Sequence, residues 1–204
     1  MLFNSECCCK RQELVFVLNA DKLVIGLTGM PGAGKSSVVE LVQEAGYDVV
    51  SMGDVIREET TKRGLALNPT NVGKVMLELR ALGGDNVVAE KCVPKIVAKE
   101  KTKIIIDGLR SYNEAEVFQK HFTNFILIAV HAPPRIRFSR LSTRGRSDDP
   151  KTWDIFHERD MRELGVGIGK SIALAEYIII NDSSIDILNS RVKELLQRVE
   201  QRCK

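Results

Sequence analysis

The sequence contains few of the residue types on which many catalytic and metal sites depend. It has three histidines and one tryptophan, and aromatic residues make up 5% of the chain. The histidines, at positions 121, 131 and 157, are far apart, and we interpret them as ordinary surface or strand-end residues. This scarcity argues against a reaction whose acid or base is histidine.

Cysteines and apolar runs also lack the spacing or length of common sites. Three of the five cysteines are consecutive at positions 7–9, whereas Cys92 and Cys203 lie far away. Neither a disulfide framework nor a C-x-x-C zinc site has this spacing, so we expect free thiols and a cytoplasmic protein. A thiol or metal role for residues 7–9 is the alternative. The apolar run at 14–18 is too short to cross a bilayer, and we expect no membrane role.

An excess of one charge is absent as well. The chain has 30 basic and 27 acidic residues and a net charge of +3. This balance does not favour binding to nucleic acid, so any functional positive charge must be local. With 204 residues the chain fits one domain that buries a sizeable core.

The chain is organised around residues 29–36, Gly-Met-Pro-Gly-Ala-Gly-Lys-Ser. They fit the phosphate-binding pattern G-x-x-x-x-G-K-[ST] at every fixed position. Residues 23–28 before them are typical of a buried strand, and residues 36–45 after them have the apolar spacing of a helix that Gly46 ends. Strand, loop and helix therefore predict a nucleotide-binding loop. A glycine-rich turn with a surface lysine is the alternative.

Each residue type in this loop has a chemical role. Glycines let several backbone N–H groups point into one concavity, and the helix that follows adds a field that favours phosphate. Lys35 is expected to reach the β and γ phosphates of ATP, and the Ser36 hydroxyl to hold Mg²⁺. We therefore expect ATP and Mg²⁺ to bind, with nucleotide contacts from Gly29, Pro31, Gly32, Ala33, Gly34, Lys35, Ser36 and Ser37.

The rest of the chain alternates strands with helices. Strands are predicted at 23–28, 47–51, 103–107, 124–130 and 177–180, and helices at 36–45, 55–63, 68–83, 85–99, 113–121, 134–141, 152–164 and 185–199. This order predicts an α/β protein with a five-stranded parallel sheet, the three-layer fold of P-loop NTPases. Residues 22–204 would form the domain, with a helical insertion at about 53–100. Residues 1–21 form an N-terminal extension without an evident place in this fold.

Two charged features follow from this reading. Asp107 ends the third predicted strand, and the carboxyl ends of strands are where α/β sheets place ligand chemistry. Arginine is concentrated between the fourth and fifth strands, at positions 135, 137, 140, 144, 146, 159 and 162. We interpret about 142–165 as a short arginine-rich lid that closes over polyphosphate, and a solvated charged face is the alternative.

In this order, the segments resemble the nucleoside monophosphate kinase group of P-loop proteins, the adenylate kinase-like family, and archaeal proteins described as adenylate kinase-related. The resemblance covers about residues 23–200. Residues 52–57 are similar to the family's G-D-x-x-R segment, which implies that Asp54 and Arg57 bind the acceptor monophosphate. The Asp-Gly-Leu-Arg at 107–110 resembles the family's D-G-x-P-R turn without its proline. This implies an acceptor contact for Arg110 and a place for the Asp107 carboxylate beside Mg²⁺.

The arginine-rich segment resembles the family's lid. Arg140 and Arg144 match R-x-x-x-R, which implies that Arg140 stacks on the donor base and that Arg144 contacts phosphate. Arg146 begins an R-x-D-D sequence. The family completes its clamp with one further arginine, for which Arg159 is the first candidate and Arg162 the second. The segment has no zinc-binding cysteines.

Asn181 begins an Asn-Asp-Ser turn after the last strand, which resembles the turn near the donor base in this group and in dephospho-coenzyme A kinases. A helix N-cap explains this turn equally well. The helical insertion would bind the acceptor.

The resemblance implies transfer of the γ-phosphoryl group of ATP to a nucleoside monophosphate, with Lys35, Arg144, Arg146 and Arg159 as catalytic residues. Because the acceptor phosphate is already an anionic nucleophile, the reaction needs no strong base. The first alternative is a dephospho-coenzyme A kinase-like enzyme, in which Asp54 or Asp107 acts as base. The second is a nucleotide-binding regulator or ATPase with little turnover. A signalling GTPase is disfavoured because no N-K-x-D motif occurs. The acceptor base and the oligomeric state are not predicted.

Overall fold

The computed structural model describes residues 21–146 and 149–202, so positions 1–20 of the predicted extension, its consecutive cysteines and Cys203 lie outside the described residues. Within these ranges, strands β1 to β5 form one sheet in which every pairing is parallel. The strand order is β2-β3-β1-β4-β5. The strands are β1 Leu23–Thr28, β2 Asp48–Ser51, β3 Lys103–Asp107, β4 Asn124–His131 and β5 Tyr177–Ile180. The predicted α/β fold with its parallel sheet is thereby confirmed.

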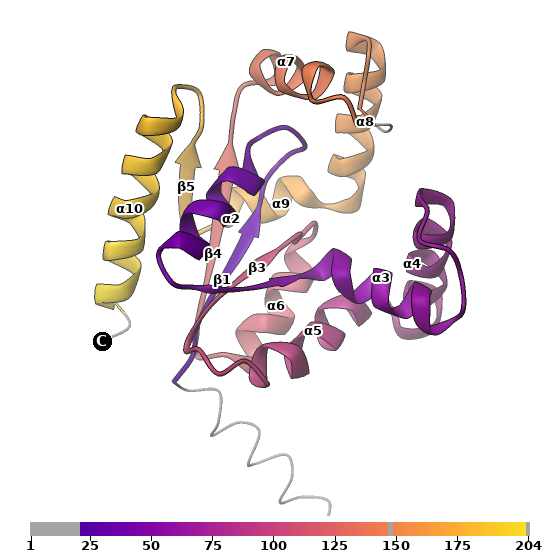
Figure 1. Ribbon diagram of the computed structural model, residues 1–204, viewed down its shortest axis with the longest axis horizontal. Helices are drawn as coiled ribbons and strands as arrows, with labels where there is room; N and C mark the ends of the chain where they lie inside the picture. The colour runs from indigo at the N-terminus through magenta and orange to yellow at the C-terminus, as the bar shows by residue number, and fades with distance from the viewer. Residues whose placement is uncertain (1–20, 147–148, 203–204) are drawn as a thin grey trace, which may run out of the picture.

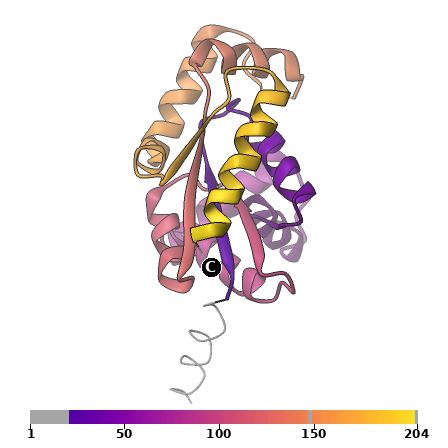
Figure 2. The ribbon, with the colours of Figure 1, turned by 90° about the vertical axis from the view of Figure 1, so that its left-hand side faces the viewer.

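Helices connect the strands and cover both faces of the sheet (Figure 1). They are α2 Lys35–Glu44, α3 Met52–Lys62, α4 Pro69–Gly83, α5 Val87–Val97, α6 Tyr112–His121, α7 Pro134–Arg144, α8 Trp153–Val166, α9 Ile168–Ala173 and α10 Ile185–Arg202. Helices α2 and α10 lie together on one face, and Figure 2 shows α10 crossing in front of the strands. Helices α5, α6 and α9 pack on the opposite face.

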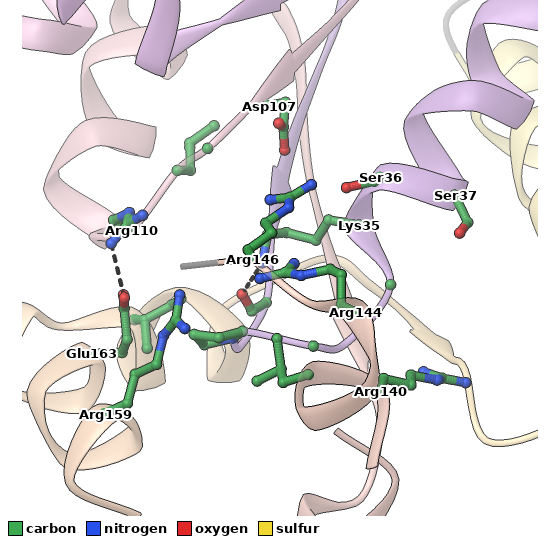
Figure 3. A pocket seen from close by; sticks show the side chains of 18 residues that line it. Lys35, Ser36, Ser37, Asp107, Arg110, Arg140, Arg144, Arg146, Arg159 and Glu163 are labelled. Atoms are coloured by element: carbon green, nitrogen blue, oxygen red, sulfur yellow. Dashed lines mark hydrogen bonds and ion pairs between the residues drawn. The ribbon is translucent and has the colours of Figure 1, made fainter. Parts of the chain in front are cut away.

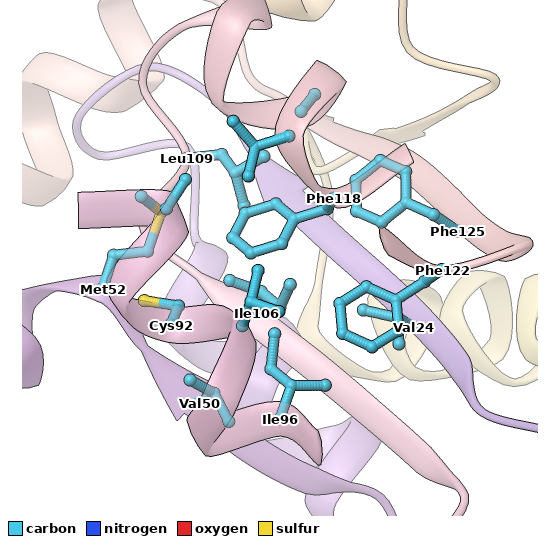
Figure 4. Close-up of a cluster of buried hydrophobic side chains, with 14 of the residues drawn as sticks. Val24, Val50, Met52, Cys92, Ile96, Ile106, Leu109, Phe118, Phe122 and Phe125 are labelled. Carbon is cyan, nitrogen blue, oxygen red and sulfur yellow. The ribbon is translucent and has the colours of Figure 1, made fainter. Parts of the chain in front are cut away.

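The alternation of side chains along the strands explains the two core layers. Ile104 and Ile106 face the layer of α5 and α6, whereas Ile105 between them faces the layer of α2 and α10. All three isoleucines are fully buried, as expected for an interior strand covered on both sides. Figure 4 shows the α5 and α6 layer, in which Cys92 packs beside Met52 and Ile96. Burial raises the pKa of the Cys92 thiol to about 12, so this cysteine is a packing residue.

The helical insertion between β2 and β3 divides into two parts. Helix α5 contributes several fully or nearly fully buried side chains to the core, so it belongs to the layers of the domain. Helices α3 and α4 extend away from the sheet toward one side of the molecule (Figure 1). The projecting part of the predicted insertion is therefore α3 and α4, not the whole of 53–100.

Two helices differ from the sequence prediction. Helix α3 begins at Met52, directly after β2, because Ser51 remains extended and serves as its N-cap. Helix α9 was not predicted; Gly167, with φ of +104°, ends α8 and starts α9, and glycines at 165, 167 and 169 weaken the helical pattern there. No helix within 21–146 and 149–202 is both long and apolar enough to cross a membrane.

The topology determines where a ligand can bind. Strand β1 lies between β3 and β4, so the chain reverses its direction of winding beside β1. The loops after β1 and β3 therefore meet at the carboxyl edge of the sheet, where parallel α/β folds form ligand crevices. The phosphate-binding loop and Asp107 lie at this edge.

Candidate functional site

The phosphate-binding loop has a backbone that favours glycine at three positions. Gly29 has φ of +147°, Gly32 has φ of +78° and Gly34 has φ of +98°. A Cβ atom on Gly29 would lie 2.3 Å from the Val130 carbonyl oxygen, and one on Gly34 would lie 2.1 Å from Asn181 Nδ2. The loop is thus pressed against the ends of β4 and β5, and its last glycine forms the N-cap of α2.

The Lys35 side chain lies back on the loop from which it comes. Its Nζ donates to the carbonyl oxygens of Gly29 at 2.5 Å and Met30 at 3.3 Å. Burial lowers the pKa of Lys35 to about 8, while the negative charge of Asp107 acts in the opposite direction. The ammonium form therefore still dominates at neutral pH and is available to a phosphate.

Asp107 and Ser36 fit a magnesium ion. Asp107 Oδ1 is buried and has no hydrogen-bond partner among the described residues. Burial raises the pKa of the Asp107 carboxyl, and the charges of Lys35 and Arg110 oppose this rise. Ser36 and Asp107 both line the cavity above the loop, and their oxygens are the hard ligands that Mg²⁺ prefers. An oxygen left without a partner there is what a cation would satisfy.

Arg110 is held by its backbone and paired through its side chain. The N–H groups of Arg110 and Ser111 both donate to Glu114 Oε2, at 2.8 and 3.2 Å, and Ser111 and Glu114 form a capping box at the start of α6. The Arg110 guanidinium reaches across to α8, where its Nη1 lies 2.8 Å from Glu163 Oε1 (Figure 3). The turn is therefore fixed, while the guanidinium extends toward the arginine-rich segment.

The lid arginines gather around one carboxylate. Arg144 donates to both oxygens of Asp149, at 3.1 and 2.5 Å, and Arg159 Nη1 lies 3.8 Å from the same carboxylate. The Arg146 N–H donates to Asp149 at 2.9 Å. Hydrogen bonding by Arg144 keeps the pKa of Asp149 below its usual value. Arg159 lines the cavity, whereas Arg162 is exposed and is not part of its lining.

Arg140 and Asn181, which the resemblance places near the donor base, contact each other beside the loop. Arg140 Nη2 donates to Asn181 Oδ1 at 3.2 Å, and Asn181 Nδ2 donates to the Ala33 carbonyl oxygen at 2.8 Å. Asn181 is buried, so its amide links the end of β5 to the phosphate-binding loop. Arg140 also lines the cavity.

A buried ion pair that the sequence analysis missed joins the loop to α8. Arg137 and Asp160 are 4% and 7% exposed, and the guanidinium donates to both carboxylate oxygens at 2.8 and 2.6 Å. The same guanidinium donates to the carbonyl oxygens of Ala132 at 3.1 Å and Pro31 at 3.2 Å. Because Asp160 follows Arg159, this pair determines where Arg159 lies relative to the loop.

The predicted acceptor residues Asp54 and Arg57 lie outside the cavity lining. They form an ion pair with each other on α3, and both side chains are at least half exposed. The Asp54 charge is still close enough to contribute to the raised pKa of Asp107. Two other predicted site residues, Ala33 and Asn181, are buried and do not line the cavity, whereas all the remaining predicted site residues line it.

The cavity that these residues enclose is suited to polyphosphate. It has a volume of about 430 Å³, which is within the usual range for small-molecule sites. Six basic side chains line it, against the two carboxylates of Asp107 and Glu163. With backbone N–H groups at the start of α2, these cations can bind a chain of phosphates and stabilise charge during phosphoryl transfer. The basic residues are Lys35, Arg110, Arg140, Arg144, Arg146 and Arg159.

Some of the missed residues left a signal in the sequence. Ser111 and Glu114 have the S-x-x-E spacing of a capping box. Asp160 lies four residues after the buried Phe156, so it shares the inward face of α8, and a carboxylate on such a face needs a cation. Glu163 left no signal, because its partner Arg110 is distant in the sequence.

Known proteins match this chain in sequence and in fold. Residues 28–154 match a family described as an AAA domain. A "UPF0200 protein" of Thermococcus gammatolerans is 47% identical over 87% of this chain and 95% of the relative, and one of Methanocaldococcus jannaschii is 45% identical over 87% and 90%. Among solved structures, shikimate kinase from Bacteroides thetaiotaomicron has a TM-score of 0.61 at 19% identity, covering 87% of this chain and 98% of that one. TT1252 from Thermus thermophilus has a TM-score of 0.58 at 18% identity, covering 87% and 97%.

The likeness to shikimate kinase shows that the fold is that of P-loop kinases, and the family match at 28–154 covers the phosphate-binding loop, the whole insertion and the first part of the lid. The chain therefore belongs to the UPF0200 family and contains a P-loop domain of the AAA type.

Proposed function

We propose that this protein transfers the γ-phosphoryl group of ATP to a nucleoside monophosphate. The observation that carries the proposal is the phosphate-binding cavity, in which six basic side chains face two carboxylates. Two polyanionic substrates must approach each other in this reaction, so a site needs an excess of positive charge on both sides of the transferred group. The cavity supplies it from four places: Lys35 at the start of α2, Arg110 after β3, Arg140, Arg144 and Arg146 on and just after α7, and Arg159 on α8.

Each side chain then has a defined task. Lys35 leaves its two carbonyl partners and binds the β and γ phosphates of ATP. Arg140 and Asn181, which contact each other, lie beside the donor base. Arg144, Arg146 and Arg159 stabilise the negative charge on the phosphoryl group during its transfer. Arg110 binds the acceptor phosphate. Arg57 would join the acceptor contacts only after α3 moves toward the cavity.

Ser36 and Asp107 would hold Mg²⁺, which supplies charge neutralisation between the β and γ phosphates when it is bound. The other residues align the two substrates and exclude water. An acceptor phosphate is an anionic nucleophile, so a site rich in arginine and without histidine in its lining is sufficient for this reaction.

A second candidate is a kinase whose acceptor is a hydroxyl group, as in dephospho-coenzyme A. The raised pKa of Asp107 favours it, because a carboxylate of higher pKa is a better general base. The fold neighbours include a kinase whose name, shikimate kinase, specifies a hydroxylated substrate, but at 19% identity this likeness extends to the fold alone.

The test is an assay of ADP release from MgATP with AMP, CMP, UMP, GMP, dephospho-coenzyme A or no acceptor. Turnover with one monophosphate supports the proposal and identifies the substrate, whereas turnover with dephospho-coenzyme A supports the second candidate. ADP release independent of every acceptor would instead indicate an ATPase or a nucleotide-binding regulator. Lys35→Ala should abolish transfer and leave the circular dichroism spectrum unchanged, and the exposed Lys91→Ala is the matched control. Full activity of the Lys35 variant would refute the assignment of this site.

A further inference from the structure

A second cavity lies next to the phosphate-binding cavity. Its volume is about 270 Å³, slightly below the roughly 300–1,000 Å³ of sites that hold a whole small molecule, so it suits one part of a larger ligand. Residues close together in the chain line the two cavities. Arg110 lines the phosphate-binding cavity and the next residue, Ser111, lines the second cavity; likewise Glu163 lines the phosphate-binding cavity and Gly165 lines the second. The lining of the second cavity is Arg80, Asp85, Ser111, Asn113, Gly165 and Val166.

The second cavity contains polar groups without protein partners. Arg80 Nε is buried and has no hydrogen-bond partner within the described ranges, although Arg80 Nη2 lies 3.5 Å from Glu114 Oε1. The Asp85 carboxylate is exposed and forms no ion pair or hydrogen bond with the described residues. A buried donor without a partner, such as Arg80 Nε, is costly, and a bound ligand is one way to satisfy it. The Arg80 guanidinium can donate hydrogen bonds, the Asp85 carboxylate can accept them and the Asn113 amide can do both. Together they suit a neutral group with both donors and acceptors, such as the edge of a nucleobase.

The ion pair between Arg110 and Glu163 stands between the two cavities. Glu163 is 12% exposed and its Oε1 lies 2.8 Å from Arg110 Nη1. The backbone on the Arg110 side is fixed, since Glu114 accepts from the N–H groups of Arg110 and Ser111. Only the guanidinium and the Glu163 carboxylate, whose contact is drawn as a dashed line in Figure 3, therefore need to separate for one molecule to extend into both cavities.

We propose that the Glu163 carboxylate occupies the acceptor phosphate's place on Arg110, and that a nucleoside monophosphate displaces it. The phosphate then pairs with Arg110 in the first cavity, and the base lies against Arg80, Asp85 and Asn113 in the second. A nucleoside without phosphate cannot replace Glu163, so the ion pair selects for phosphorylated acceptors. This inference rests on the proposed function and adds to it the acceptor's base site and a competing side chain.

The test is calorimetric binding of AMP, CMP, UMP and GMP, and of the four nucleosides, to the full chain and its variants. Glu163→Gln should tighten binding of the preferred monophosphate several-fold, because the competing negative charge is gone. Asp85→Asn and Arg80→Gln should weaken it roughly tenfold, the effect of one lost hydrogen bond to a charged group. ATP affinity should stay within about twofold in both base-site variants. Lys74→Gln is the matched control on α4, since this lysine is exposed and its ion pair is with Glu78 on the same helix.

The outcomes separate the two proposals. If the wild-type chain transfers phosphate to a monophosphate but Glu163→Gln binds it no more tightly, the competing role of Glu163 is wrong and the proposed function stands. If Asp85→Asn and a folded Arg80→Gln both bind like the wild type, the second cavity is not the base site. If the wild-type chain binds MgATP and no monophosphate, the proposed function fails and this inference with it. If loss of the Arg80 contact to Glu114 prevents Arg80→Gln from folding, Asp85→Asn still tests the base site.

Discussion

Replacing Asp160 by asparagine removes one charge of a buried ion pair and leaves the Arg137 guanidinium in place. Breaking such a pair by removing one partner costs ~3–5 kcal/mol, because the remaining charge is buried without compensation. Arg137 would keep its bonds to the carbonyl oxygens of Ala132 and Pro31 and its contact with the Phe156 ring at 4.9 Å. We therefore expect the lower end, a loss of about 3 kcal/mol in the free energy of unfolding.

Urea unfolding followed by circular dichroism measures this loss. For a protein of this size, it corresponds to a melting temperature roughly 6–12 °C lower. Glu158→Gln, which removes an exposed carboxylate from the same helix, should change stability by less than about 0.5 kcal/mol. The double variant Arg137→Met with Asp160→Asn should lose at least ~1 kcal/mol less than the sum of the single variants, because the uncompensated charge is gone. A loss below about 1 kcal/mol for Asp160→Asn, or strict additivity in the double variant, would refute the view that this pair holds α8 to the phosphate-binding loop.

Two further predictions concern the loop itself. Lys35 has a pKa of about 8 in the free protein, and a bound phosphate favours its charged form. ATP affinity should therefore be constant below pH 7 and fall above pH 8, by up to about tenfold per pH unit. Titrations with a fluorescent ATP analogue test this, and an equal slope of affinity against pH in Lys35→Ala would assign the effect to another group. Gly34→Ala should abolish nucleotide binding, because the added Cβ would lie 2.1 Å from Asn181 Nδ2. Gly46→Ala is the control: Gly46 has a similar φ of +94°, but its Cβ would have no atom within 4 Å, so this variant should lose stability alone. Equal ATP affinities for the two variants in the same titrations would contradict the steric argument.

Local signals in the sequence were sufficient for the fold and for the centre of the site. The glycines of the phosphate-binding loop are required by backbone geometry at their own positions, and the three isoleucines before Asp107 show that this strand is covered on both faces. Strand and helix periodicity reflects contacts between neighbours in the chain, so the parallel sheet could be predicted without knowledge of its packing. Helix α9 was missed because glycine at 165, 167 and 169 hides its short pattern.

The pairing of charges was decided by the tertiary structure. The sequence leaves both Arg159 and Arg162 as candidates, with Arg159 first, and packing of α8 turns Arg159 toward the cavity and leaves Arg162 exposed. Asp160 meets Arg137, and Glu163 meets Arg110, only because α8 packs beside α7 and the turn after β3. Asp54 and Arg57 match a motif, yet α3 holds them outside the cavity. A local pattern specifies the backbone of its own segment, whereas an ion pair between distant segments depends on how whole helices pack, and no short stretch of sequence encodes that.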